Sequence, residues 1–332
     1  MSKKLLTPLL LIPMFLSFLP VSFAESFSDV NVGDKYYISI SYLQEHGIIE
    51  GYEDNTFRPY EDINRSEALK MLTLASGIFT DDMFEETEEE IEEDVDEEID
   101  EEIEEEVDEE VDEEPEEEQP FTDTSWEQWF TPYLAAAKDY GIIEGYSDGS
   151  FQPFETINLV ETLKIFLESY DDIDYSKTEE YLVNDTPLYE WFSKYTAYAV
   201  EQNLINIYST NTITPDQDMT RGYMAEIIYR KIMTEKGYEF GKATWYGAAL
   251  QGNYTASGEI FDYHQMTAAH LTLPFGTIVE VTNLANGESI QVEITDRGPY
   301  GPGRVIDLTS AAFKEIASLG AGVIYVQYEI IE

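Results

Sequence analysis

Residues 47–59 have the sequence GIIEGYEDNTFRP, and residues 141–153 repeat it as GIIEGYSDGSFQP. Each copy follows a Phe-x-Asp segment and precedes a segment with Ile-Asn and Glu. A third, more divergent copy keeps the same order of features. Self-similarity in a fixed order indicates a repeat architecture, so we expect three related units. The flanking segments are 27–30 and 63–68 in the first unit, 121–123 and 157–161 in the second, and 183–186 and 219–226 in the third.

Each unit has the pattern of a helix, a turn and a second helix. In the first unit Ile40, Leu43 and Ile48 form a short apolar stripe, and Gly47 suits the end of a helix. Residues 51–59 then supply turn-forming side chains before a second amphipathic helix. One such unit cannot bury its apolar face alone, so the three are expected to pack together.

The repeated pattern resembles that of S-layer homology domains. We assign the three units to residues 25–80, 121–175 and 180–235. The resemblance implies an all-α bundle of three units with pseudo-threefold symmetry. It also implies grooves that bind anionic, often pyruvylated, secondary cell-wall polysaccharide.

The same resemblance implies that Arg65 and Arg221 contact the polysaccharide, because they match the arginine of the family's closing signature. A guanidinium suits this task, since it is permanently charged and grips a carboxylate with two hydrogen bonds. A helix cap or a surface ion pair is the alternative for both residues. In the second unit Leu159 stands at this position, which predicts that the second unit's groove is weakened or lost.

Residues 1–24 have the pattern of a secretory signal peptide. Two lysines precede the apolar stretch 5–23, and the small residues Ser22 and Ala24 stand where cleavage requires them. An uncleaved membrane anchor is the alternative, but three prolines interrupt the stretch. No other segment is apolar enough to span a bilayer. We therefore expect a secreted protein with no integral membrane segment after signal cleavage.

Residues 81–120 are expected to form an acidic, disordered linker. Of the 34 residues from 85 to 118, 26 are Asp or Glu. Ile or Val recurs at every fourth position, and on a helix each such step overshoots one turn by about 40°. No continuous apolar face would form, and like charges would repel. Weak capture of Ca²⁺ is an alternative, because carboxylate oxygens suit that ion.

The overall composition excludes several function classes. The chain has 332 residues, a formal net charge of −51 and no cysteine. Disulfides, thiolate nucleophiles and Cys-ligated metals are therefore excluded. Nucleic acid is not an expected partner, because its phosphates need a basic face. The three histidines have no ligand spacing, so we predict neither a metal nor a cofactor.

Residues 239–332 have the pattern of a small β-barrel. Residues 277–282 form a β-branched run, Asn286-Gly287 indicates a hairpin, and residues 289–295 alternate in polarity. A further strand is expected at residues 323–330. Thr309 or Ser310 is placed to cap a short helix between them.

The motifs of this segment closely resemble those of the rare lipoprotein A family. That resemblance implies a double-psi β-barrel, related in fold to expansins. It also implies lytic transglycosylase activity, in which the bond between MurNAc and GlcNAc of peptidoglycan is cleaved to leave a 1,6-anhydroMurNAc end. The motifs are GKATWYG at 241–247, YTASGE at 254–259, TAAH at 267–270, DRGP at 296–299 and RVIDL at 304–308.

This chemistry needs a carboxyl group that protonates the leaving oxygen and then takes the proton of the attacking C6 hydroxyl. No water is activated, so the second carboxylate of ordinary glycosidases is dispensable. Asp296 matches the family's aspartate. It follows Ile290, Val292 and Ile294 in the alternation of the strand, which predicts that it faces the same apolar side.

Other roles follow from the positions of residues within the motifs. His270 is expected to hydrogen-bond the substrate or to steady Asp296. Tyr246 and Trp245 are expected to stack on sugar rings, with a core position as the alternative. Thr255 is a cleft residue by its place in the motif. Asp307 is interpreted as structural.

We therefore predict a secreted lytic transglycosylase that its S-layer homology units hold non-covalently at the cell wall. Its partners would be peptidoglycan glycan strands and secondary cell-wall polysaccharide, and anchoring would raise the effective substrate concentration. One alternative is an expansin-like module that binds or loosens the wall without cleavage. The other is a purely structural surface protein.

Overall fold

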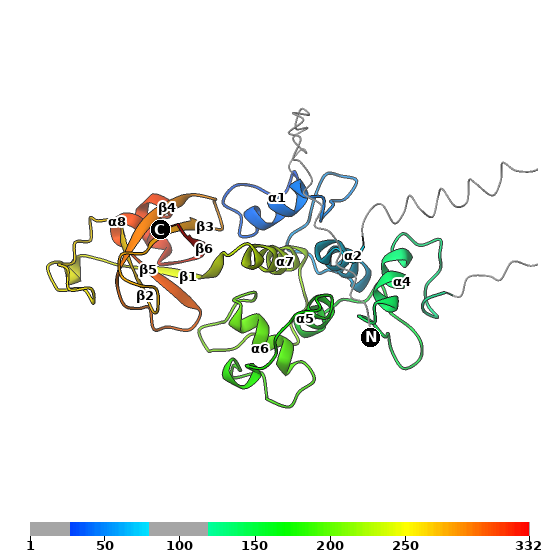
Figure 1. Ribbon diagram of the computed structural model, residues 1–332. Coiled ribbons are helices and arrows are strands. Elements are labelled where there is room, and N and C mark those ends of the chain that lie inside the picture. The colour runs from blue at the N-terminus through cyan, green and yellow to red at the C-terminus, as the bar shows by residue number, and fades with distance from the viewer. Residues whose placement is uncertain (1–26, 80–118, 332) are drawn as a thin grey trace, which may run out of the picture.

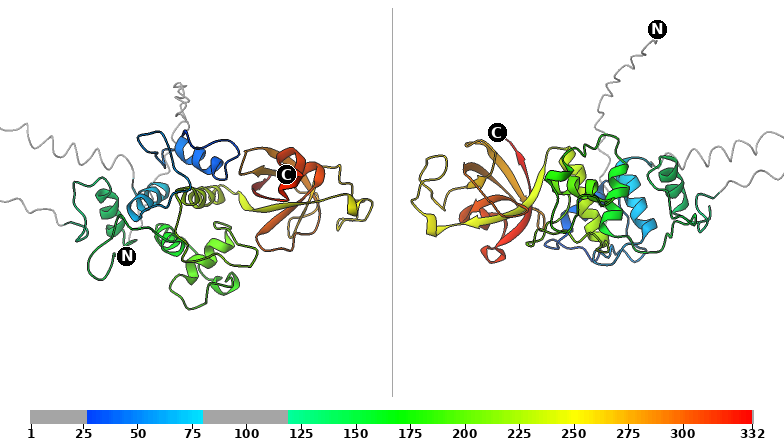
Figure 2. Two further views of the ribbon diagram at one scale, coloured as in Figure 1. Left: turned by 180° about the vertical axis from the view of Figure 1, so that it is seen from behind. Right: turned by 90° about the horizontal axis from the view of Figure 1, so that it is seen from below.

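A computed structural model describes residues 27–79 and 119–331 as a helical region followed by a β-barrel (Figure 1). The predicted signal peptide and nearly all of the predicted acidic linker lie outside the described residues. The last helix of the helical region leads directly into the first strand of the barrel, and the two parts lie side by side in the further views (Figure 2). The chain therefore has the two-part layout, helical and then β, that its sequence predicts.

The helical region repeats a pairing of helices. Contacts join α1 to α7, α4 to α2 and α6 to α5. Asn64 and Asn158 cap α2 and α5 through reciprocal hydrogen bonds with a glutamate three residues later, and Thr220 caps α7. The helices are α1 (Tyr37–Glu45), α2 (Arg65–Ser76), α4 (Thr131–Asp139), α5 (Leu159–Glu168), α6 (Ser193–Glu201) and α7 (Arg221–Glu235), with a 3₁₀ turn at Thr178–Glu180.

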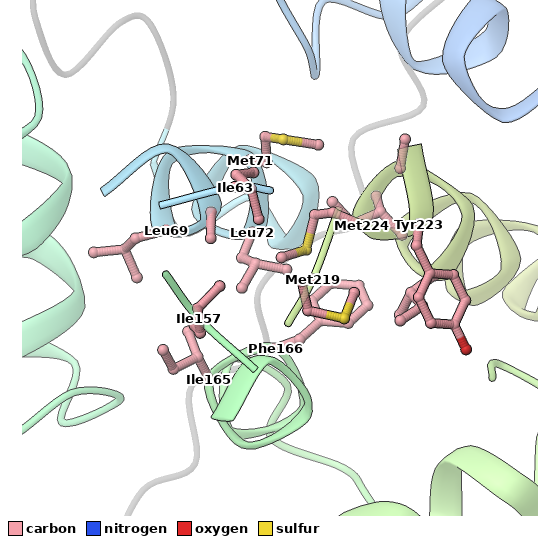
Figure 3. Packing of buried hydrophobic residues seen from close by; sticks show 14 of the residues in the cluster. Ile63, Leu69, Met71, Leu72, Ile157, Ile165, Phe166, Met219, Tyr223 and Met224 are labelled. Atoms are coloured by element: carbon pink, nitrogen blue, oxygen red, sulfur yellow. The ribbon is translucent and has the colours of Figure 1, made fainter. Parts of the chain in front are cut away.

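The centre of this region is a small ring of backbone hydrogen bonds. The amide of Ile63 donates to Met219, that of Met219 to Ile157, and that of Ile157 to Ile63. Each residue immediately precedes a helix cap, and the three side chains are fully or almost fully buried. Figure 3 shows them between α2, α5 and α7, with Leu72 and Phe166 nearby. The ring ties the starts of the three helices to one shared core.

The strands close into a barrel in the order β1-β5-β2-β4-β3-β6. The pairs β1/β5 and β2/β4 are parallel, and the other pairs are antiparallel. This closed sheet fits the expected double-psi arrangement. The elements are β1 (Glu239–Tyr246), β2 (Thr267–His270), β3 (Ile278–Asn283), β4 (Ser289–Asp296), β5 (Arg304–Thr309), α8 (Ser310–Ile316) and β6 (Val323–Ile330), with 3₁₀ turns at Ala248–Leu250 and Leu319–Ala321.

Alternate residues of these strands fill the interior of the barrel. Ala268, Val292, Ile294, Ile306 and Leu308 are buried there together with the apolar face of α8. The strands at 278–283, 289–296 and 323–330 and the helix capped by Thr309 confirm the sequence predictions for this part of the chain. Among residues 27–79 and 119–331, no helix has both the length and the apolar composition needed to cross a membrane.

Candidate functional site

Two aspartates lie in one row of residues on the outer face of the barrel. Asp296 on β4 pairs with Ala269 on β2, and Ala269 pairs with Asp307 on β5. Asp307 in turn pairs with Thr244 on β1. Residues that pair directly across neighbouring strands point to the same face of a sheet. Asp296 and Asp307 therefore flank Ala269, with Thr244 next to Asp307.

This position of Asp296 corrects the sequence prediction. Ala268 pairs with Ile294, but the next residue, Ala269, pairs with Asp296, so Thr295 is an extra residue on β4. An extra residue of this kind, a β-bulge, reverses the alternation that follows it. Ile294 faces the apolar interior, and Asp296 faces outward with Ala269. The sequence prediction was wrong because alternation alone cannot reveal the bulge.

Backbone donors hold the carboxylate of Asp296 in place. Its Oδ1 accepts hydrogen bonds from the amides of Ala256, at 2.9 Å, and Arg297, at 2.8 Å. The first bond ties the loop 254–260 to the end of β4, and Thr255 stiffens that loop through a hydroxyl contact with Ser257. The buried Thr255 thus shapes the wall of the site.

The carboxyl group of Asp307 is partly buried and pairs with Arg304. Burial raises the pKa of its carboxyl group above the usual range, although Arg304 opposes this shift through a hydrogen bond and its charge. The guanidinium of Arg304 also donates to the hydroxyl of Thr244. The sequence motifs predict a structural role for Asp307. Its pairing opposite Ala269 could have been found only from the register of strands that the sequence did not predict.

The segment that follows Asp296 covers the same row. Gly298 has a φ angle of 136°, a conformation that side chains disfavour. A Cβ atom added there would lie 3.9 Å from Oδ2 of Asp307 and 4.0 Å from the Cβ of Ala269. The DRGP motif thus brings the backbone close to both carboxyl groups, and it forms one side of the site.

Tyr246 and Trp245 are at the end of β1. Burial raises the pKa of the Tyr246 hydroxyl, and the charges of Asp296 and Asp307 add to this effect. Its ring stacks on Phe261 with the centroids 4.8 Å apart. Trp245 is partly exposed, and its indole NH donates to the carbonyl of Leu319. Tyr246 therefore lies near the carboxyl pair, and Trp245 offers a ring surface to solvent.

His270 points into the barrel, away from the row. It pairs with Ile306, an interior residue of β5. Its Nδ1 accepts hydrogen bonds from the amides of Thr272 and Leu273, and its Nε2 lies 2.9 Å from the hydroxyl of Tyr328. Burial lowers the pKa of its ring. The structure thus does not bring the side chains of His270 and Asp296 to one face, although Arg297 bonds to the carbonyl of His270.

The helical region contains two similar grooves. Groove 1, of about 400 Å³, is lined by residues 48–52, Glu67, Lys70, Met71, Trp129 and Arg221. Groove 2, of about 300 Å³, is lined by residues 142–146, Glu161, Lys164, Ile165, Trp191 and Arg65. Each combines exposed aromatic surface with a lysine and an arginine. Each lining also holds two glutamates, and Lys70, Arg221 and Arg65 pair with Glu50, Glu67 and Glu161. The exposed rings are therefore the part of each groove that suits a sugar.

The two arginines serve grooves formed mainly by another unit. Arg221 of the third unit donates to the carbonyls of Phe57 and Glu50 in the first. Arg65 of the first unit donates to Phe151 in the second. The prediction that Leu159 weakens the second unit's own groove was therefore wrong, because the arginine of groove 2 comes from the first unit.

Removal of Arg221 is expected to destabilise the fold. The side chain is 5% exposed and lies against the rings of Tyr52 and Phe57. Arg221→Ala would leave carbonyls without a donor, so we expect a loss of about 3 kcal/mol in the free energy of unfolding. Urea denaturation measures this. The half-buried, ion-paired Arg58 is the control, and Arg58→Ala should cost less than about 1 kcal/mol. Equal losses of unfolding free energy in the two variants would contradict a stabilising role for the buried Arg221.

Comparison with known proteins separates the two parts of the chain. Residues 238–328 match a family model described as lytic transglycolase. A relative from Vibrio cholerae named endolytic peptidoglycan transglycosylase RlpA is 49% identical over 104 residues, which cover 31% of this chain and 40% of that protein. The chain carries an RlpA-like domain. Residues 26–69 and 120–159 match the S-layer homology domain, so these two segments of the helical region are of that type.

Further similarities also cover less than a third of this chain. A protein of the same name from Yersinia pestis is 53% identical over 85 residues, covering 25% of this chain and 24% of that protein. The chain thus spans less than half the length of these two relatives. Among solved structures, a Streptomyces papain inhibitor is 29% identical, with a TM-score of 0.25, over 29% of this chain and 94% of its own. A Clavibacter michiganensis expansin is 24% identical, with a TM-score of 0.25, over 29% of this chain and 50% of its own.

Proposed function

We propose that the RlpA-like domain is a peptidoglycan lytic transglycosylase that the S-layer homology region holds at the cell wall. It would cleave between MurNAc and GlcNAc within glycan strands and leave 1,6-anhydroMurNAc ends. The observation that carries this proposal is the row on the outer face of the barrel, where Asp296 and Asp307 flank Ala269. The names of the relatives support the same reaction for the domain.

In this proposal Asp307 is the acid. Burial raises the pKa of its carboxyl group, so the protonated form persists to a higher pH than in an exposed aspartate. That proton passes to the glycosidic oxygen as the bond from C1 to this oxygen breaks. The C6 hydroxyl of the same sugar then attacks C1, and its proton returns to the Asp307 carboxylate. A C1–O6 bond replaces the broken bond, and no water is consumed.

Asp296 would act as the second carboxylate. Its charge, held by two backbone amides, would stabilise the positive charge that develops at C1 in the transition state. This assignment differs from the sequence hypothesis, in which Asp296 alone transferred the proton. The sequence hypothesis did not include Asp307, and the row on the outer face is the reason for the change.

The remaining predicted residues receive supporting roles. His270 would be a positioning residue, because it fixes the turn after β2 and its carbonyl holds Arg297 beside Asp296. Tyr246 would make the site less polar around the carboxyl pair. Trp245 would stack on a sugar ring, and Thr255 would hold the loop that carries Ala256.

The pH dependence of the reaction tests the role of Asp307. The acid form is present below its raised pKa and is lost as the pH rises through it, so kcat/KM should fall on the alkaline side. Arg304 lowers this pKa. Arg304→Gln is therefore expected to move the alkaline limb to higher pH. Lys314→Gln on α8 removes the same charge from an exposed position and should leave the limb in place. A shift to lower pH in Arg304→Gln would count against Asp307 as the acid.

For the helical region we propose a bundle of three S-layer homology units, built around the ring of Ile63, Ile157 and Met219. Grooves 1 and 2 would bind an acidic secondary cell-wall polysaccharide, with pyruvylated sugars as the finer proposal. Trp129 and Trp191 would stack on its sugars, while Lys70 and Lys164 would face its charge. The protein would be secreted and held at the wall without a covalent bond.

Mass spectrometry of released fragments tests the proposed function. The full chain and its Asp307→Asn variant are incubated with peptidoglycan, both intact and stripped of stem peptides. We expect anhydro-ended fragments from the unmodified chain only. No fragments from either protein, although both sediment with walls, would favour the expansin-like binding module instead. A chain that neither cleaves nor binds walls would contradict both readings.

A further inference from the structure

The repeat predicts a third groove at residues 203–208 of the third unit, and different residues stand at its lining positions. Grooves 1 and 2 each take an arginine from one neighbouring unit and a tryptophan from the other. In the same cyclic order, the third unit's groove takes Leu159 where the others have arginine. The tryptophans immediately precede the cap residues of α4 and α6, and Lys35 holds that place before α1.

The barrel lies on this third groove. Its Lys242 and Tyr325, with the two glycines Gly241 and Gly303, line one small hollow together with Asn203, residues 205–207 and Arg230 of the helical region. That hollow has a volume of about 10 Å³, against about 400 and 300 Å³ in grooves 1 and 2. A space of this size holds about one water molecule and no sugar.

Polar contacts join the two parts at this point. The ammonium of Lys242 donates to the carbonyl of Ile207 at 2.6 Å. Ile207 stands at the position of Gly51 and Gly145 in the other units. Burial lowers the pKa of the Lys242 amine and raises that of the Tyr325 hydroxyl. Both barrel side chains are therefore drawn into the interface.

Helix α7 provides the floor of the interface. Arg230 is 2% exposed and donates to Asn206 at 2.9 Å and to the carbonyl of Asn203 at 3.0 Å. It also pairs with the buried Glu226, which stands where grooves 1 and 2 have Lys70 and Lys164. The third groove thus has a carboxylate in place of that lysine, and this carboxylate pairs with Arg230.

An apolar contact extends the interface beside the groove. Tyr229 and Met233 of α7 form one buried cluster with Phe240 of β1 and Leu284 of the β3–β4 turn. The hydroxyl of Tyr229 also donates to the side chain of Gln327 on β6 at 2.7 Å. A joint with a buried apolar cluster and buried hydrogen bonds resists relative motion better than a polar linker does.

We propose that the third groove is the docking site of the chain's own barrel. It binds no wall polymer, it leaves grooves 1 and 2 as the polymer sites, and it holds the barrel in one orientation to them. The third groove then differs from the other two because it holds the barrel and not a polymer. The residues that differ are Leu159, Lys35 and Glu226. This proposal concerns the joint alone, so it stands or falls independently of glycan cleavage.

An engineered disulfide tests the docking. A Cβ atom added at Gly303 would lie 3.7 Å from the Cβ of Ile207, a separation that suits a disulfide. The chain has no native cysteine. In the full chain, Ile207→Cys with Gly303→Cys is expected to form an intramolecular disulfide under mild oxidation. The control pair, Glu144→Cys with Gly303→Cys, keeps the same change in the barrel and places its partner in groove 2.

Non-reducing electrophoresis follows the rate of cross-linking. We expect the third-groove pair to react at least about 100-fold faster than the control pair, because docking raises the local thiol concentration. The small-angle X-ray scattering curves of the oxidised variant and of the unmodified chain should then superimpose. The proposal would be overturned if the two pairs reacted at equal rates or if both formed intermolecular dimers. It would also be overturned if the unmodified chain had a larger radius of gyration than the oxidised variant.

Discussion

Asparagine in place of Asp307 is expected to slow the release of anhydro-ended fragments about 1000-fold, within the range for loss of a general acid. Asparagine keeps the size of the side chain and a hydrogen-bond partner for Arg304, but it carries no proton to transfer. Rates of fragment release from stem-free glycan strands measure the effect. Asp172→Asn, an exposed change in the helical region, is the matched control and should leave the rate unchanged.

A second substrate separates the roles of the two aspartates. On a MurNAc glycoside whose leaving group departs without protonation, Asp307→Asn should lose less activity than on glycan strands. Asp296→Asn should lose as much on both substrates, because its proposed role is to stabilise charge at C1. The reverse pattern would return the acid role to Asp296 and contradict the present assignment.

Loss of Trp129 and Trp191 together is expected to release the protein from cell walls. Both side chains are about half exposed, at 52% and 53%, and each closes one groove. Their removal takes away stacking surface for sugars without emptying a buried site. Each single change to Ala should weaken wall binding about 10-fold. The double variant should weaken it at least about 100-fold, because the two grooves act together on one polymer.

Sedimentation with isolated walls measures this binding. Tyr189→Ala is the matched control, because Tyr189 is 96% exposed but is outside both grooves. Its wall binding should equal that of the unmodified chain. If the double variant still sediments like the control, the grooves are not the polymer sites and the anchoring proposal fails.

Local sequence signals predicted most of the fold. The apolar stripe of Ile40, Leu43 and Ile48 and the repeated turns marked the helices, and the alternation at residues 289–295 marked β4. β1, β2 and β5 were not predicted. β2 has only four residues, TAAH, and β1 contains Gly241 in place of an alternating apolar side chain. Short strands of a closed barrel are defined by their neighbours more than by their own composition.

The site was harder to predict, because it depends on register. The family resemblance indicated Asp296, but the extra residue Thr295 changes the face on which it lies. Asp307 is proposed as a site residue because it pairs with Ala269 on the neighbouring strand, and no local pattern reveals that pairing. His270 belongs to the same motif set, yet its ring binds within the interior to Tyr328. Arg65 likewise lines a groove that residues of the second unit form.

The central claim is that C1 of the sugar is transferred from the glycosidic oxygen to the C6 hydroxyl of the same sugar, without water. Digestion of peptidoglycan by the full chain in water labelled with heavy oxygen tests it most directly. The account predicts new glycan ends that are lighter by one water than hydrolysed ends and that carry no label, and the Asp307→Asn variant should produce almost none. Labelled reducing ends would show attack by water and would contradict the account.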